Sequence, residues 1–168
     1  MRHVLVVANQ TLADEKLLDV VQSLVAHEPC TVELVVPVTP LTDQEASLRH
    51  SEHLTKTAGE SGAVTLAMHR LNTCIGKLAE LGIDAQGDTG DPSPMKAVAA
   101  CMAAHPADVI VVSTLPRRYS RWLSNRVPDR LRRKYGVTVL HVETESKAEH
   151  SRHHVSGAPA SITHLSHR

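Results

Sequence analysis

Eight basic side chains are concentrated in one segment of this sequence, Ser113 to Gly136 ("STLPRRYSRWLSNRVPDRLRRKYG"). The segment directly follows an apolar run that is typical of a buried strand, and Ser and Asn side chains stand among its arginines. Guanidinium groups form paired hydrogen bonds with phosphate oxygens, and hydroxyl groups near a helix start offer further donors. The residue types are therefore those of a phosphate-binding turn.

Two other interpretations of this basic segment stay open. An ordinary amphipathic helix would carry one apolar stripe and a solvated basic face. The spacing fits, since the stripe would hold Leu123, Val127, Leu131 and Tyr135, and the opposite face Arg126, Arg130 and Arg133. Aromatic residues among arginines also favour nucleic-acid binding. Against it, the chain has 18 basic and 18 acidic residues and no recognised DNA or RNA motif.

The length and composition of the chain limit which folds could position this segment. A chain of 168 residues is long enough for one domain with a full core. It is 42% hydrophobic but only 2% aromatic, without Phe, so aliphatic side chains must fill the interior. Three widely spaced Cys residues without a CxxC pair favour a reducing compartment over a disulfide framework. No apolar run approaches the length of a membrane span, and we expect a soluble, cytoplasmic protein.

Strands and helices are predicted to alternate along the chain. Continuous apolar or β-branched runs predict strands at 3–8, 30–38, 83–90, 108–113 and 136–142. Helical spacing lies between them, with expected starts near a Thr11–Asp14 capping box, Ser93 and Asn125. This order predicts an α/β fold, a doubly wound open parallel five-stranded sheet with helices on both faces.

The domain is predicted to span residues 1–142. Residues 143–168 are polar, contain five His and show no periodicity, so we expect a disordered tail without a fixed metal site. The polar region 42–57 is interpreted as an exposed helix or a mobile segment.

Doubly wound sheets bind ligands beyond the carboxyl ends of their strands, where the strand order reverses. The candidate ligand surface is therefore formed by residues 9–11, 37–40, 88–91 and 113–125. With Asn125 as N-cap, Pro128 takes the third helical position and the helix N-terminus faces the strand ends. Asp88 and Asp91 are interpreted as turn caps rather than as a catalytic pair.

Four stretches of the chain resemble the universal stress protein family. They cover roughly residues 3–142 and read "VLVVANQT", "ELVVPV", "GDPSPMKAVAACMAAHPADVIVVS" and "WLSNRVPDRLRRKYGVTVLHV". The resemblance implies a homodimer built through the last strand, residues 137–142, and an adenine nucleotide such as ATP at the strand ends. An apolar edge strand needs such cover independently of the resemblance.

The sequence departs from the glycine motif of the ATP-binding members, Gly-x2-Gly-x9-Gly-Ser/Thr. Ser113 and Pro116 stand at the first two glycines, Ser124 and Asn125 at the final pair, and Asn9 replaces the Asp of the first turn. If the strand ends bind a ligand, the candidate nucleotide- or phosphate-binding residues are Asn9, Thr11, Val38, Ser113, Thr114, Arg117, Arg118, Ser124 and Asn125.

The function expected from these observations is that of a regulatory binding protein that binds an adenine nucleotide weakly. No Ser-His-Asp spacing, GxSxG or P-loop lysine is present, so we expect no enzyme and no catalytic residue. Two alternatives remain: a protein-interaction module whose turn is plugged by Pro116, and a nucleic-acid binder acting through residues 117–134.

Overall fold

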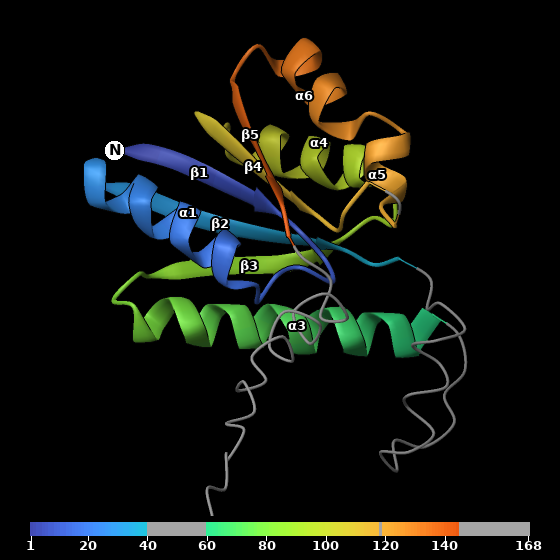
Figure 1. Ribbon diagram of the computed structural model, residues 1–168, viewed down its shortest axis with the longest axis horizontal. Helices are drawn as coiled ribbons and strands as arrows, with labels where there is room; N and C mark the ends of the chain where they lie inside the picture. Colours follow the sequence, from blue (N-terminus) through green and yellow to red (C-terminus); the bar gives the residue numbers. More distant parts are fainter. Residues whose placement is uncertain (40–59, 118, 145–168) are drawn as a thin grey trace, which may run out of the picture.

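Five parallel strands form one sheet at the centre of the molecule (Figure 1). The computed structural model describes residues 1–39, 60–117 and 119–144. The sheet order is β3-β2-β1-β4-β5. The strands are β1 (Arg2–Val7), β2 (Cys30–Pro37), β3 (Ala85–Gly90), β4 (Val109–Thr114) and β5 (Thr138–Glu143). The predicted fold class, a doubly wound open parallel five-stranded sheet, is confirmed.

Helices cover both faces of this sheet (Figure 1). On one face lie α1 (Glu15–His27) and α3 (Glu60–Glu80). On the other lie α4 (Pro94–Ala104), the four-residue α5 (Arg121–Ser124) and α6 (Val127–Tyr135). Side chains alternate between the two faces along each strand, so a strand can contribute apolar side chains to the core on both faces. In β1, Val4 and Val6 pack under α1 and α3, whereas Leu5 and Val7 pack under α4 and α6. Burial on both faces explains why the strands are continuously apolar.

The first helix begins later than the sequence predicts. Asp14, and not Thr11, is the N-cap of α1, and its carboxylate accepts a hydrogen bond from the Lys16 backbone N–H at 3.0 Å. The predicted capping box, with Thr11 as N-cap, is therefore wrong. Thr11 is instead buried at the end of the sheet, where its hydroxyl has a different partner.

The predicted helix start at Asn125 is also wrong. The Ser120 hydroxyl accepts from the Leu123 backbone N–H, which starts the short helix α5, and Asn125 lies at the C-terminal end of that helix. After a left-handed residue, Arg126 with φ 52°, the chain begins α6 at Val127. An early hydroxyl cap thus splits the segment into two helices.

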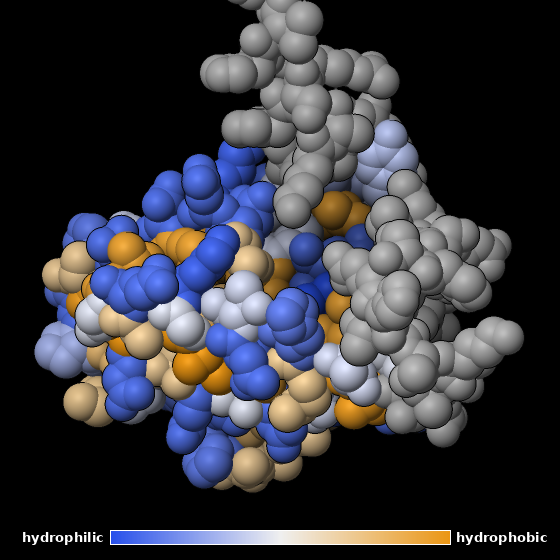
Figure 2. All heavy atoms as spheres, turned by 90° about the horizontal axis from the view of Figure 1, so that it is seen from below, coloured by the Kyte–Doolittle hydropathy of each residue, from blue (hydrophilic) through white to orange (hydrophobic). Residues whose placement is uncertain are grey.

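The amphipathic helix α3 buries one face against the sheet. Its buried side chains are Ala63, Ala67, Leu71, Cys74 and Leu78. Val64 and Met68, on the same helix, are each 40% exposed. From the side of α3, the described surface shows small apolar areas between polar side chains (Figure 2).

The structure describes two residues beyond residue 142, the predicted end of the domain. The strand β5 runs to Glu143, and the buried Thr144 donates its backbone N–H to the Thr114 carbonyl at 2.9 Å. Of the tail predicted to be disordered, residues 143–168, all from 145 onward lie outside the described residues, as do the whole region 42–57 and Arg118. Within the described residues, no helix is both long and apolar enough to cross a membrane.

Candidate functional site

The strand order reverses between β1 and β4. These two strands are neighbours, but the chain leaves β1 toward α1 on one face and leaves β4 toward α5 and α6 on the other (Figure 1). In open α/β sheets, ligands bind at the carboxyl ends of strands whose connections diverge in this way. The predicted ligand surface therefore lies at the topological switch point. We call the described residues at these strand ends, 8–11, 37–39, 88–91 and 113–125 except 118, the carboxyl-end site.

Two predicted residues meet directly across the switch point. The Ser113 hydroxyl at the end of β4 donates to the Thr11 hydroxyl in the loop after β1, at 2.8 Å. Both side chains are nearly inaccessible, with 1% and 5% of their surface exposed. Two buried hydroxyl groups that satisfy each other hold the two strand exits together.

Asn9 fixes the neighbouring strand exit. Its side-chain N–H groups donate to the Pro37 carbonyl at 2.8 Å and to the Thr39 hydroxyl at 2.7 Å. Its side-chain oxygen accepts a hydrogen bond from the guanidinium of Arg70. Asn9 is only 7% exposed, so it acts as a buried crosslink between the ends of β1 and β2 and the helix α3.

Arg70 is a member of this site that sequence reasoning missed. It lies in the middle of α3, half-buried, where a basic residue in an amphipathic helix is usually read as solvent-facing. Only the packing of α3 against the sheet brings its guanidinium to Asn9. No pattern in the sequence signals this contact.

Thr114 turns away from Ser113. Adjacent residues of a strand face opposite sides of the sheet. The buried Thr114 hydroxyl forms a 2.8 Å hydrogen bond with Nε2 of His141 on β5. Burial lowers the pKa of His141, with the nearby Arg132 charge acting in the same direction and Glu143 opposing it. This shift favours the neutral imidazole as the hydrogen-bond partner of Thr114.

The remaining predicted residues are Val38, Arg117, Arg118, Ser124 and Asn125. Val38 is half-buried, and its backbone N–H donates to the Gly90 carbonyl at 3.0 Å. Arg117 and Asn125 are exposed. Arg118 and the side chain of Ser124 lie outside the described residues.

The two acidic residues after β3 have local roles. The Asp91 carboxylate accepts from the Ser93 backbone N–H at 2.8 Å, and that of Asp88 from the Thr89 N–H at 2.7 Å. Asp91 thus caps the turn that leads into α4, which agrees with the role predicted for it from the sequence. Gly90 lies so close to α4 that an added Cβ would stand 2.8 Å from the Ala97 Cβ.

Three solved structures that match this architecture are universal stress proteins. One, from the universal stress protein family of Burkholderia pseudomallei, has a TM-score of 0.56 at 15% identity, covering 83% of this chain and 94% of that one. A universal stress protein family protein from Arabidopsis thaliana with AMP bound has a TM-score of 0.56 at 13% identity, covering 89% and 95%.

A third such structure is a universal stress protein in complex with cAMP, with a TM-score of 0.55 at 16% identity, covering 85% of this chain and 97% of the other. No protein-family model matches the sequence, and no curated protein matches it significantly. The chain has a universal stress protein-like fold. At these identities the likeness is one of fold, and it extends over nearly the whole length of each neighbour.

Within this universal stress protein-like fold, the structure gives a physical account of the altered first turn. By the sequence resemblance, Asn9 takes the place of the Asp in the first turn of the ATP-binding members. Its side-chain amide forms hydrogen bonds with a carbonyl, a hydroxyl and a guanidinium group. A carboxylate could not donate to the Pro37 carbonyl. The amide at position 9 is thus matched to its surroundings.

Proposed function

We propose that this chain is a cytoplasmic, stress-linked regulatory protein that binds an adenine nucleotide weakly at the carboxyl-end site. It carries out no dedicated catalysis and works as a homodimer. The observation that carries the proposal is the switch point itself, where Thr11 and Ser113 join the two strand exits at 2.8 Å. Two neighbours of the same fold hold AMP or cAMP, which supports a nucleotide as the ligand.

The phosphate end of such a ligand would be bound by arginine rather than by glycine backbone. The carbonyl of Pro116 accepts from the Tyr119 and Ser120 backbone N–H groups at 2.8 and 3.1 Å, closing a turn after β4. Arg117 lies exposed in this turn. A guanidinium held there can form charge-assisted hydrogen bonds with phosphate oxygens, which stabilise a complex more than neutral ones.

The first test is a titration of the full chain with ATP, ADP, AMP and cAMP, with and without magnesium, followed by calorimetry and thermal unfolding. We expect saturable binding of at least one nucleotide. A ligand at about a hundred times its Kd stabilises the folded state by roughly 2.7 kcal/mol, which thermal unfolding detects readily.

Variants locate the site. Arg117→Ala combined with Arg118→Ala should weaken the binding at least about tenfold, because lost charge-assisted hydrogen bonds each contribute roughly 1.5–3 kcal/mol. Arg130→Ala combined with Arg133→Ala removes the same charge from the exposed face of α6 and should leave the affinity unchanged. Equal affinity in both double variants would reject the phosphate role of the turn.

One observation favours the second candidate, a protein-interaction module without nucleotide. The polar groups of Asn9 already bond to Pro37, Thr39 and Arg70, and the Thr11 and Ser113 hydroxyls bond to each other. A nucleotide would have to add to this network or displace part of it. If no nucleotide at millimolar concentration shifts the unfolding temperature, the interaction module is the better proposal.

A further inference from the structure

The charges of this chain are separated along the sequence. The segment 117–134 carries eight basic residues and one acidic residue, a surplus of seven positive charges. The other residues of the chain include ten basic and seventeen acidic ones, a surplus of seven negative charges. The neutral total therefore hides a strongly basic region, and the phosphate role proposed for Arg117 and Arg118 accounts for only two of its charges.

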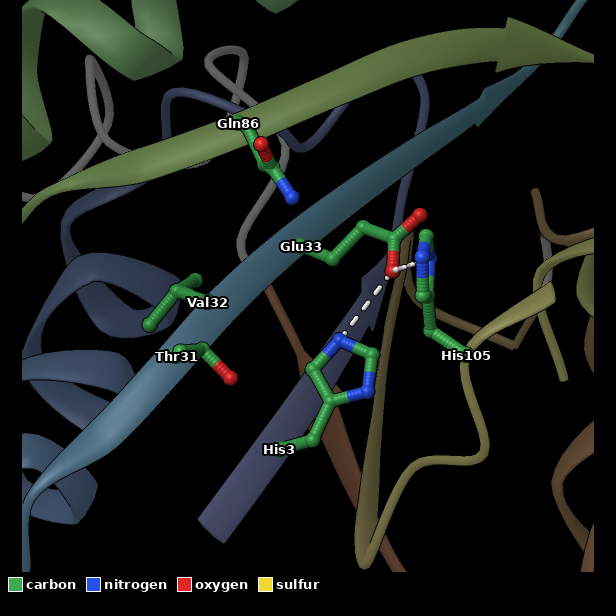
Figure 3. A pocket seen from close by; sticks show the side chains of 6 residues that line it. All are labelled: His3, Thr31, Val32, Glu33, Gln86 and His105. Carbon is green, nitrogen blue, oxygen red and sulfur yellow. Dashed lines mark ion pairs between the residues drawn. The ribbon is translucent and has the colours of Figure 1, made fainter. Parts of the chain in front are cut away.

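Acidic residues are concentrated on other elements. Helix α1 with its two cap residues carries four acidic residues and a single lysine, and it covers the opposite face of the sheet from α6 (Figure 1). Some carboxylates also have partners there. Glu28 forms an ion pair with Arg2 at 3.2 Å. In a pocket near the amino ends of the strands, the Glu33 carboxylate lies 3.1 Å from Nε2 of His3 and 3.8 Å from Nδ1 of His105 (Figure 3). These carboxylates are engaged away from α6.

Three arginines share the outer side of α6. The N-cap residue Arg126 precedes Arg130 by four residues, and Arg133 follows after three more, a spacing that brings side chains to one side of a helix. All three are exposed, whereas the buried residues of α6, among them Leu131, lie on its other side. We call these three arginines the α6 basic face. They extend over about 10 Å along the helix axis, because each residue adds about 1.5 Å.

The other two basic residues of α6 have partners within the chain. Arg132 forms an ion pair with Asp129 at 2.9 Å and donates to the Val139 carbonyl. The Lys134 ammonium lies 5.2 Å from the ring centroid of Tyr135, a cation–π contact. Asp129 is the one acidic residue of the segment 117–134, and Arg132 pairs with it. Within the described part of the chain, no carboxylate is paired with the α6 basic face.

The backbone conformation at Arg126 is unusual for an arginine. Among the described residues it is the one residue other than glycine with a positive φ, of 52°. Glycine or asparagine adopts a left-handed backbone at a lower cost than arginine does. Unfavourable backbone conformations of this kind are concentrated at functional sites. The turn itself does not call for an arginine, and what arginine adds there is an exposed guanidinium.

We propose that the α6 basic face, together with Tyr119 in the turn before α5, binds the phosphodiester backbone of single-stranded nucleic acid. Guanidinium groups form paired hydrogen bonds with phosphate oxygens, and seven of the eight basic residues of the segment are arginines. Tyr119 is 57% exposed, and its ring offers a surface on which a base can stack. Helix α5, which follows Tyr119, packs against α6.

The size and surroundings of the α6 basic face favour a single strand over a duplex. A face about 10 Å long contacts only a few phosphates. The surplus negative charge of the other elements repels a rigid polyanion that extends beyond this face. A flexible single strand can contact the arginines and then bend away. An acidic peptide would meet the same positive charges, but it has no base to stack on Tyr119.

The test measures binding of the full chain to a fluorescein-labelled poly(U) RNA of about 15 nucleotides by fluorescence anisotropy at several salt concentrations. With three or four phosphates neutralised, the logarithm of the association constant should fall against the logarithm of the salt concentration with a slope of roughly −2 to −3. Oligo(dT) of the same length should show a similar slope, because RNA and DNA share the phosphodiester backbone.

A pair of double variants locates the binding surface. Arg130→Ala combined with Arg133→Ala should weaken RNA binding about tenfold and reduce the size of the salt slope by roughly 1.4, since two phosphate contacts are lost. Lys16→Ala combined with Lys96→Ala removes the same charge from exposed positions on α1 and α4 and should keep the affinity and slope of wild type. Arg126→Gly should weaken binding without lowering the Tm, because glycine adopts this backbone freely.

Three outcomes would overturn the proposal. The first is that neither RNA nor oligo(dT) binds at low salt, and the second is that both double variants bind with equal affinity. The third is that poly-glutamate displaces the RNA at equal charge concentration, because the face would then recognise an acidic protein. If Arg130→Ala with Arg133→Ala loses RNA binding but keeps nucleotide binding, the α6 basic face is separate from the carboxyl-end site, so either proposal can fail without the other.

Discussion

At the scale of single residues, the candidate site consists mainly of polar side chains that satisfy one another. Thr114 and His141 form a 2.8 Å hydrogen bond that joins β4 to β5, and this contact is sensitive to pH. Burial keeps this imidazole neutral in the folded chain by lowering its pKa from the ordinary value of 6.5. The unfolded chain has no such burial.

This difference predicts a pH dependence of stability. Below about pH 6.5 the unfolded chain takes up a proton at position 141 that the folded chain does not, so the free energy of unfolding falls as the pH falls. His141→Asn keeps a hydrogen-bonding side chain and removes the titration. We expect the variant to lose less stability than wild type between pH 7 and pH 5 in urea unfolding. His27→Gln, on an exposed helix end, is the control, and parallel pH profiles for His141→Asn and wild type would contradict the argument.

At the scale of elements, close approach between neighbours decides where glycine is required. A Cβ at Gly87 on β3 would stand 2.4 Å from the Leu34 carbonyl oxygen and 2.9 Å from a methyl group of Leu71. The first of these is backbone of the adjacent strand, which cannot move without disturbing the sheet. Gly76, inside α3, is exposed and has nothing within 4 Å of an added Cβ.

The same substitution should therefore have opposite effects at the two positions. Gly87→Ala should destabilise the fold by about 1–3 kcal/mol through overpacking. Gly76→Ala should stabilise it by roughly 0.5–1 kcal/mol, because alanine is the better helix former. Urea unfolding measures both, and a neutral Gly87→Ala would mean that β2 and β3 are not paired in the register of Leu34 with Gly87.

At the scale of the whole molecule, one edge of the sheet bears on assembly. Strand β5 has β4 as its only neighbour in the described sheet. Arg132 on α6 donates to the Val139 carbonyl at 3.0 and 3.3 Å, which holds β5 to α6. Leu140 and His141 nevertheless remain only half-buried. Edge strands of this kind pair readily with a second copy, and a two-fold axis would make that pairing antiparallel.

The proposed homodimer gives a direct expectation. Wild type should sediment at twice the monomer mass of 18.2 kDa. Leu140→Lys places a charge in the contact and should shift the equilibrium to monomer. Leu81→Lys, a change of the same type at an apolar residue 42% exposed at the end of α3, should leave the dimer intact. A wild type that sediments as a monomer across the micromolar range would remove the dimer from the proposal.

Much of this architecture could be predicted because it depends on local signals. Continuous apolar runs such as "VLVV" and "VIVV" require burial on both faces, and alternation with helices requires parallel strands. Gly82, with φ 75°, follows the end of α3, where a left-handed backbone favours glycine. The placement of the candidate site at the strand ends followed from the same alternation.

The sequence by itself determined the fold class, the order of elements and the polar character of the strand ends, because periodicity and turn chemistry are local properties. Only the tertiary structure decided which polar groups meet. Arg70 reaches Asn9, Ser113 and Thr114 face opposite sides, and His3, Glu33 and His105 gather in one pocket. These contacts join residues far apart in the chain, and they exist because parallel pairing and helix packing set the register between elements, which no local pattern records.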